Sequence, residues 1–339
     1  MGKNLQVLLA CLGEGRFLLG VLLADSFDHY YEEGQKMSKK MVSLFLVLLM
    51  VFSATASLAE GSEIVVTDMF GREVTLSEPA TRIVVIQPSD CEILCAIGCE
   101  EAIVGRGQYV DYPASILEVP VVQSGAETNV EEILALQPQV VLMNSMSQSE
   151  EQVKQLEENG VKVVVSTTSN IESVYTAIRL IGKLMGKDAE AEAVITDMQT
   201  TFDEIKAKTS GETKNVYFEI SPPPYLYTAG SSSYMNELAE ICGITNVFGD
   251  QEDAWLMISE EQVIERNPDY IVLITGMGSA GVEEILSREG WGDINAIKNQ
   301  KVFNDDDSCM ARPSPRLKDA AIELYNFVYE IEAEEKPAA

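Results

Sequence analysis

Two stretches of the chain are written to the same plan: NVEEILALQPQVVLM runs from Asn129 to Met143, and SEEQVIERNPDYIVL runs from Ser259 to Leu273. Each stretch predicts a capped helix of about two turns, a break at a proline, and then a strand of β-branched and apolar residues. In register, the matching positions are Glu131 with Glu261, Ile133 with Val263, Leu134 with Ile264, Pro138 with Pro268, and Val140 with Tyr270.

A second match lies upstream of the first. Glu92-Ile93-Leu94 and Gly98 correspond to Glu237-Leu238-Ala239 and Gly243, and the two segments run on to further glycines, Gly105 and Gly249. A repeated α/β unit in one chain predicts two similar lobes, because each unit needs its own buried sheet. A cleft between two lobes is a common place for a ligand.

Between and around these stretches, strands and helices alternate, which is typical of parallel sheets covered on both faces. We therefore predict an α/β fold with two similar lobes of mainly parallel sheet. An amphipathic run capped by Asp188 and extending to about Lys208 would span roughly 30 Å as a helix and join the lobes. The expected domains are an N-terminal lobe, an interlobe helix, a C-terminal lobe and an acidic tail, at residues 60–187, 188–210, 211–330 and 331–339.

The N-terminal region resembles an export signal. Lys39 and Lys40 precede an apolar run, residues 42–52, that is too short to cross a bilayer. Cleavage is expected near Ala59, so residues 37–59 form the predicted signal peptide. The mature protein would then lie in the periplasm or at the outer face of the cytoplasmic membrane. Residues 1–36 are interpreted as a mis-annotated extension ahead of the true start, and no lipid anchor is predicted at the signal peptide of residues 37–59.

Composition narrows the possible functions. The formal net charge of −30 argues against a nucleic-acid partner and suits a monomer. The single histidine, His29, lies before the predicted cleavage site. The mature chain would therefore lack histidine-dependent catalytic triads and histidine-rich metal sites. We predict a binding protein with no cofactor, and the alternative is an envelope enzyme on the same two-lobed scaffold.

The cysteines allow a third interpretation. Cys91, Cys95 and Cys99 recur every fourth residue, which predicts one helix face and disfavours disulfides between them. They fit either small buried apolar residues or a thiolate metal site. In the second case Cys91 and Cys309 would face each other across the cleft and bind a bare metal ion.

In order and spacing, seven segments resemble the iron-chelate and vitamin B12 type of ABC-transporter substrate-binding proteins, whose two lobes are joined by a rigid helix. The resemblance covers about residues 63–330. It implies an extracytoplasmic protein that captures a ferric siderophore, a corrinoid such as cobalamin, or haem, and delivers it to an ABC permease dimer with a cytoplasmic ATPase. The matching segments are 82–94, 108–113, 128–138, 227–230, 255–268, 290–291 and 312–316.

The resemblance also implies two docking residues. Glu131 and Glu261 occupy equivalent positions of the repeat, and in the family a surface glutamate on each lobe binds arginines of the permease. The alternative is local, since acids in the first turn of a helix are stabilised by the helix dipole.

For the ligand, the resemblance implies contacts from both lobes. Tyr109 and Trp255 match aromatic residues that cover a flat ligand, and the alternative is that both rings pack in cores. Arg312 matches an arginine near the ligand, and its alternative is a structural ion pair. Gly125 stands where a cobalamin-binding relative would carry tryptophan, and basic residues near the cleft are few, which favours a weakly charged ligand. The full set of expected ligand contacts is Ser89, Asp90, Tyr109, Gly125, Tyr227, Trp255, Ser308 and Arg312.

Overall fold

A computed structural model describes residues 63–125, 128–144, 149–209, 214–274, 281–305 and 308–331. The predicted signal peptide, the extension before it, His29 and most of the acidic tail lie outside the described residues. Within the described ranges, no helix combines the length and the apolar character needed to cross a bilayer.

The first lobe is built on a five-stranded parallel sheet. Its strand order is β5-β4-β3-β6-β7, and the two central strands β3 and β6 are almost entirely buried. This burial explains why these strands read as continuous apolar runs. The strands are β3 (Ile83–Val85), β4 (Ile103–Gly107), β5 (Val121–Val122), β6 (Val140–Asn144) and β7 (Lys162–Ser166), and the helices between them are α4 (Pro88–Ala96), α5 (Val130–Ala135) and α6 (Glu150–Glu158).

A short antiparallel hairpin precedes this sheet, with strands β1 (Ile64–Thr67) and β2 (Glu73–Leu76). Asp68 holds its turn by accepting hydrogen bonds from the backbone N–H groups of Phe70 and Arg72. The other oxygen of Asp68 accepts from the N–H of Val165 on β7, which attaches the hairpin to the first sheet.

The second lobe repeats the first with a four-stranded parallel sheet. Its order, β10-β8-β12-β13, corresponds to β4-β3-β6-β7 of the first lobe. Val140 pairs with Ile83, and its repeat counterpart Tyr270 pairs with Val216, so the predicted duplication is confirmed strand by strand. The elements are β8 (Asn215–Glu219), α9 (Tyr234–Ile241), β10 (Thr245–Asn246), α10 (Glu260–Arg266), β12 (Tyr270–Leu273), α11 (Val282–Ser287), α12 (Asn295–Lys298) and β13 (Val302–Asn304).

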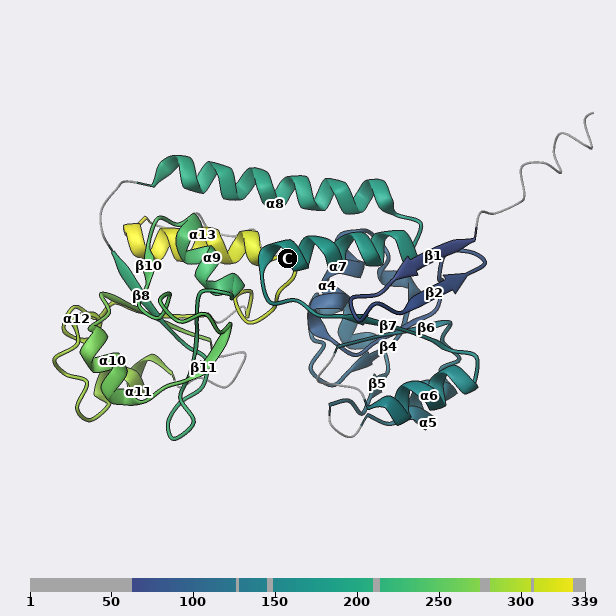
Figure 1. Ribbon diagram of the computed structural model, residues 1–339, viewed down its shortest axis with the longest axis horizontal. Coiled ribbons are helices and arrows are strands. Elements are labelled where there is room, and N and C mark those ends of the chain that lie inside the picture. Colours follow the sequence, from purple (N-terminus) through teal and green to yellow (C-terminus); the bar gives the residue numbers. More distant parts are fainter. Residues whose placement is uncertain are drawn as a thin grey trace, which may run out of the picture. The chain divides into compact units, whose positions relative to one another are not determined.

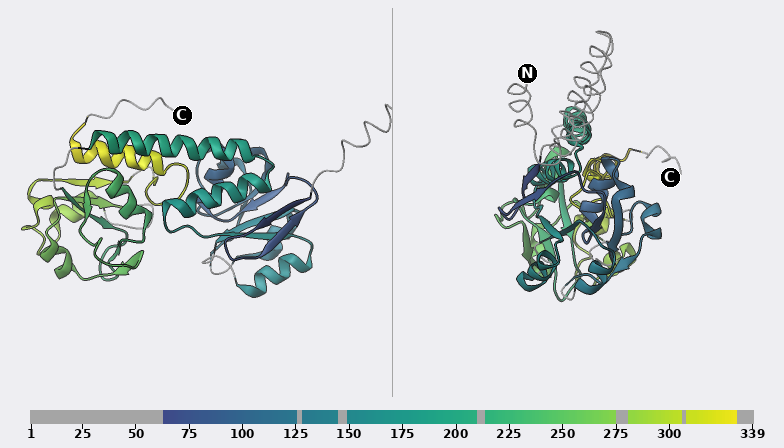
Figure 2. Two further views of the ribbon diagram at one scale, coloured as in Figure 1. Left: turned by 45° about the horizontal axis from the view of Figure 1, so that its top comes forward. Right: turned by 90° about the vertical axis from the view of Figure 1, so that its right-hand side faces the viewer.

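One long helix, α8 (Asp188–Lys208), connects the lobes. It packs on α7 (Ile171–Leu184) of the first lobe and on α9 and α13 (Leu317–Tyr329) of the second (Figure 1). α13, in yellow in Figure 2, runs alongside α8. The predicted interlobe helix is therefore confirmed, with one correction. Lys187 is the N-cap and Asp188 is already helical, and the cap makes no side-chain hydrogen bond.

Two other sequence predictions were wrong in detail. α4 begins at Pro88, and the left-handed Gly98 (φ 76°) follows its end, so Cys99 lies outside the helix that carries Cys91 and Cys95. The sequence also predicts a short strand at Val247, whereas β10 ends one residue earlier, at Asn246. The buried side chain of Asn246 accepts from the N–H of Phe248 and donates to the carbonyl of Ala229.

Candidate functional site

The second lobe carries a two-stranded antiparallel ribbon, β9 (Tyr227–Ala229) with β11 (Trp255–Met257). Met257 pairs with Tyr227, and Trp255 lies two residues away, so these three side chains share one face of the ribbon. That face is open: 40% of Tyr227, 38% of Trp255 and 63% of Met257 is exposed. On the other face Thr228 is buried, and its hydroxyl donates to the Phe218 carbonyl at 2.7 Å. We call residues 227–229 and 255–257 the aromatic ribbon.

The first lobe contributes the loop that follows β4, residues 108–113, which we call the β4 loop. It carries Tyr109, of which 66% is exposed. The buried Arg106 holds the loop through hydrogen bonds to the carbonyls of Val110 (2.7 Å) and Val119 (3.2 Å). The close passage of β4 past β3 requires Gly107, because a Cβ there would lie 2.4 Å from the Ile86 carbonyl oxygen.

A chain of contacts connects the aromatic ribbon with the β4 loop. Trp255 packs edge-on against Tyr234 of α9, with 5.6 Å between ring centroids. The Tyr234 hydroxyl donates to the Met310 carbonyl at 3.0 Å. Two residues further on, Arg312 pairs with Asp111 of the β4 loop at 2.6 Å. The contacts thus lead from Trp255 in the second lobe to Asp111 in the first, two residues from Tyr109, and we call this region the interlobe junction.

Arg312 also belongs to a buried ion-pair cluster. Glu92, on α4, is 3% exposed and accepts from Arg312 Nη1 at 3.2 Å and from Arg316 Nη1 at 3.3 Å. The Ser314 hydroxyl donates to its other oxygen. Arg312 therefore forms the structural ion pair that was expected as its alternative role. The pair was expected between strands, but it joins the two lobes. We call Glu92, Arg312, Ser314 and Arg316 the Glu92 latch.

The repeat counterpart of Glu92 makes the reciprocal crossing. Glu237, on α9, accepts from the N–H of Ile171 at 2.6 Å, at the start of α7. Beside it, the N–H of Tyr234 donates to the Ser169 carbonyl at 2.7 Å. Burial raises the pKa of Glu237, and the hydrogen bond from Ile171 opposes the rise. Sequence comparison had paired Glu92 with Glu237 but did not assign either of them a role.

Ser89 and Asp90 do not reach this junction. Both are buried in the first turn of α4. Ser89 accepts from the Gln87 amide at 3.0 Å, and Asp90 accepts from the Ser166 hydroxyl at 2.8 Å. Burial raises the pKa of Asp90 to about 7. The sequence placed these residues at the correct sheet edge, but the Asp90 side chain bonds β7 and the Ser89 side chain bonds the neighbouring Gln87.

Gly125 and Ser308, also expected at the ligand, both have left-handed backbone (φ 105° and 55°). Gly125 follows Ser124, whose hydroxyl accepts from the N–H of Gln108 in the β4 loop at 3.1 Å. A Cβ at Gly125 would meet open space. Ser308 is half-buried, and its N–H donates to the Asp305 carbonyl at 3.2 Å. Both positions lie next to the junction, and their contact with a ligand stays a prediction.

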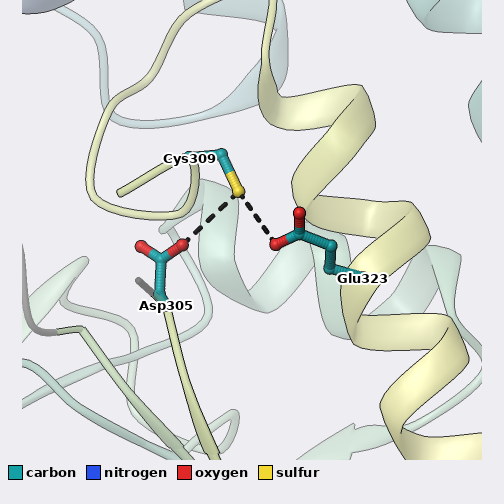
Figure 3. Close-up of side chains that lie close together, drawn as sticks. All are labelled: Asp305, Cys309 and Glu323. Carbon is teal, nitrogen blue, oxygen red and sulfur yellow. Dashed lines mark hydrogen bonds between the residues drawn. The ribbon is translucent and has the colours of Figure 1, made fainter. Parts of the chain in front are cut away.

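Cys309 lies between two carboxylates (Figure 3). Its sulfur is 3.4 Å from Asp305 Oδ1 and 3.3 Å from Glu323 Oε2, a donor set that could in principle hold a metal ion. Asp305 also accepts from the N–H groups of Met310 and Ala311, so this cluster anchors the segment that leads to Arg312. Burial, together with the two carboxylates, raises the pKa of the Cys309 thiol well above its usual range.

Cys91 is the thiol expected opposite Cys309 across the cleft. Cys91 is buried, and its sulfur donates to the Tyr112 carbonyl at 3.7 Å. A hydrogen bond with Cys95, and then burial, raise the pKa of Cys91 well above its usual range. A raised pKa disfavours the thiolate form that binds metal ions, so the surroundings of these two sulfurs do not favour the thiolate hypothesis.

A hollow of about 450 Å³ lies on the α8 side of the Glu92 latch. It separates α4 of the first lobe from the start of α13, with Val194 and Met198 of α8 in its wall. Tyr112 contributes to the lining, but the aromatic ribbon does not. The hollow is therefore distinct from the ligand cleft predicted from the sequence.

The two expected docking glutamates lie on the surface. In α5 the capping Asn129 accepts from the N–H groups of Glu131 and Glu132, and Glu132 in turn accepts from the N–H of Gln123, while Glu131 is exposed. In α10 the cap is Ser259. Glu260 accepts from Trp291 Nε1 at 2.9 Å, and Glu261 is exposed. A hydrogen bond with Ser259 lowers the pKa of Glu261. Glu131 and Glu261, at the repeated position, are thus both exposed, and in each helix a neighbouring acid makes an intramolecular hydrogen bond.

Comparison with known proteins agrees with this architecture. The sequence model of a family described as periplasmic binding protein matches residues 83–309. The chain belongs to this family. As a periplasmic binding protein it carries the family's two-lobed α/β fold, so the fold expected from the repeat is confirmed.

Three relatives illustrate the range of the family. An uncharacterized ABC transporter substrate-binding lipoprotein of Bacillus subtilis is 33% identical over 273 residues, covering 78% of this chain and 85% of the relative. A vitamin B12-binding protein of Salmonella typhi is 30% identical over 254 residues, covering 74% and 91%. The crystal structure of a possible iron-binding periplasmic protein of Staphylococcus epidermidis superimposes with a TM-score of 0.63 at 28% identity, covering 74% of this periplasmic binding protein and all of that chain.

Proposed function

We propose that this protein is the extracytoplasmic substrate-binding component of an ABC importer and carries a metal chelate to the permease. The observation that carries the proposal is the joining of two exposed aromatic surfaces, the aromatic ribbon and the β4 loop, at one interlobe junction. Flat rings offer a large contact area at low cost in side-chain entropy. The ligands named for the relatives, vitamin B12 and iron, support a corrinoid or a ferric siderophore, with haem as a further member of the class.

The proposed role needs no chemical step. The protein would be exported, bind the chelate unchanged, and release it at the membrane. The raised pKa of both candidate thiols supports binding without a thiolate–metal bond. One exposed glutamate on each lobe, Glu131 and Glu261, would pair with arginines of the permease and set the orientation of the complex.

A thermal-shift panel of cyanocobalamin, haem and ferric siderophores tests the proposal on the mature protein. A ligand that binds only the folded state raises the unfolding midpoint by mass action. Calorimetry and mass spectrometry of the released ligand then report affinity and chemical integrity. The proposal fails if no chelate shifts the midpoint, or if the ligand is recovered chemically altered.

A further inference from the structure

Within the proposed function, the charges around the junction restrict which chelate can bind. We infer that the chelate carried by this protein has no net negative charge. Recognition would rest on ring contacts, without a cation from the protein.

The first observation is that Arg312 is already engaged. Its guanidinium pairs with Glu92 and Asp111, and 14% of its side chain is exposed. An anionic ligand that recruited Arg312 would have to displace Asp111 or break the pair with Glu92, whose side chain is 2% exposed. Removing a partner from a buried charge is strongly unfavourable.

The other arginines beside the junction are committed in the same way. Arg316 pairs with Glu92 and lies 3.9 Å above the Tyr112 ring. Arg106 is buried against carbonyls that hold the β4 loop. In the second lobe Arg288 pairs with the buried Glu219 and with Glu284, and 6% of its side chain is exposed.

The second observation is an excess of acids at the surface. The side chain of Asp111 is 58% exposed, and Glu252 and Asp253 are exposed just before β11 of the aromatic ribbon. The internal segments outside the described residues contain no lysine or arginine in their sequences, so they supply no further cation: 126–127, 145–148, 210–213, 275–280 and 306–307.

A neutral or cationic chelate avoids both penalties. The exposed rings of Tyr227, Trp255 and Tyr109 offer apolar area to a neutral ligand and a negative ring face to a cation. The same surface repels a polyanion such as a ferric tris-catecholate. The protein's own carboxylates lie near the aromatic ribbon, and the arginine side chains described above are already paired. Charge selection of this kind works by rejecting the wrong ligand.

Calorimetry at two salt concentrations tests the inference. The uncharged or cationic probes are cyanocobalamin, cationic cobinamide, a neutral ferric trihydroxamate and a cationic one; the anionic probes are haem and a ferric tris-catecholate. We expect the tightest ligand to come from the first group, with a Kd at least about tenfold below that of either anion. Added salt should weaken cation binding, because it screens the attraction to the carboxylates.

Two charge-matched variants isolate the cause. Asp253→Lys, beside the aromatic ribbon, should strengthen binding of the anionic probes and weaken binding of the cationic ones. Glu204→Lys, exposed on α8, changes net charge equally and should alter neither. An anionic probe that binds the parent protein as tightly as the best neutral one overturns the inference and leaves the proposed function standing. Equal effects of the two variants also overturn it, and failure of every probe to bind would overturn both proposals.

Discussion

The two lobes share a core and differ in what is added to it. The strand order β4-β3-β6-β7 of the first lobe recurs as β10-β8-β12-β13 in the second. The first lobe adds β5 and holds the β4 loop, whereas the second adds the aromatic ribbon. Tyr109, Tyr227 and Trp255 lie on these additions. The duplicated core thus supplies a scaffold, and the parts that break the repeat supply the candidate ligand surface.

The two lobes also place a buried acid at different positions of the repeat. In the first lobe the helix residue Asp90 bonds Ser166 at the end of β7. The equivalent positions in the second lobe are Met235 and Asp305. Met235 follows from the match of Glu92 with Glu237. Asp305 follows from the match of β6 with β12, because it comes directly after β13 as Ser166 ends β7. The buried acid lies on the helix in the first lobe and at the strand end in the second, where Asp305 anchors the segment that leads to Arg312.

The largest expected effect concerns Asp90. Its folded-state pKa of about 7 lies above the ordinary value of 3.8, so the folded protein favours the protonated carboxyl. The resulting stabilisation is complete below about pH 4 and is lost as pH rises towards 7, amounting to at most about 4 kcal/mol. Asp90→Asn, which stays neutral, should remove this part of the pH dependence. Urea unfolding from pH 4 to 7 measures it, and parallel profiles for the variant and the parent protein would contradict the assignment.

The two crossing glutamates should differ in strength. Glu92→Ala leaves Arg312 and Arg316 without their shared buried partner, and we expect a loss of about 3 kcal/mol in the free energy of unfolding. Glu237→Ala removes one hydrogen bond at the start of α7, and the expected loss is about 1 kcal/mol. Urea titration at neutral pH compares them.

Glu204→Ala, exposed on α8, is the matched control for both variants and should change the unfolding free energy by less than about 0.5 kcal/mol. Glu92→Gln retains the size of the side chain but not its charge, so it separates loss of the ion pair from loss of packing. Equal losses for Glu92→Ala and Glu237→Ala would show that the two crossings are energetically equivalent and that the Glu92 latch has no special role.

The added elements should govern affinity. Trp255→Ala should weaken chelate binding by about 2 kcal/mol, since truncated aromatic residues at the centre of a binding surface often have effects of this size. Met235→Leu, a conservative change in the repeated core, should leave the Kd within about threefold. Calorimetry with the best chelate checks both. Unchanged affinity of the Trp255 variant would remove the aromatic ribbon from the site.

The docking pair should affect neither stability nor affinity. Replacing Glu131 and Glu261 together by Ala should leave the chelate Kd unchanged and reduce uptake in cells that express the importer. Glu132→Ala with Glu260→Ala is the control from the same two helix turns, and there the intramolecular hydrogen bonds should be lost. If chelate affinity collapses in the first double variant, the docking assignment is wrong.

Much of the architecture could be predicted from the sequence, because repeated caps, prolines and apolar runs reflect local physics. The helix cap at Asn129 and the paired glycines Gly98 and Gly243 are of this kind. The Glu92 latch could not be predicted, since its partners lie more than 200 residues away along the chain and depend on tertiary packing. The same limit explains Asp90: the sequence places it at the sheet edge, but the side-chain direction is decided by Ser166. The ribbon strands are three residues each and carry little periodic signal.

The central claim, that the aromatic ribbon is the chelate surface, can be tested through its tryptophan. The chain has two tryptophans, and Trp291 is fully buried. In a Trp291→Phe variant, Trp255 is the one remaining tryptophan, and with selective tryptophan excitation its accessibility to acrylamide can be followed by fluorescence lifetime during a chelate titration. The account predicts saturable protection of Trp255 with the Kd found by calorimetry. Chelate binding that leaves Trp255 as accessible as before would contradict it.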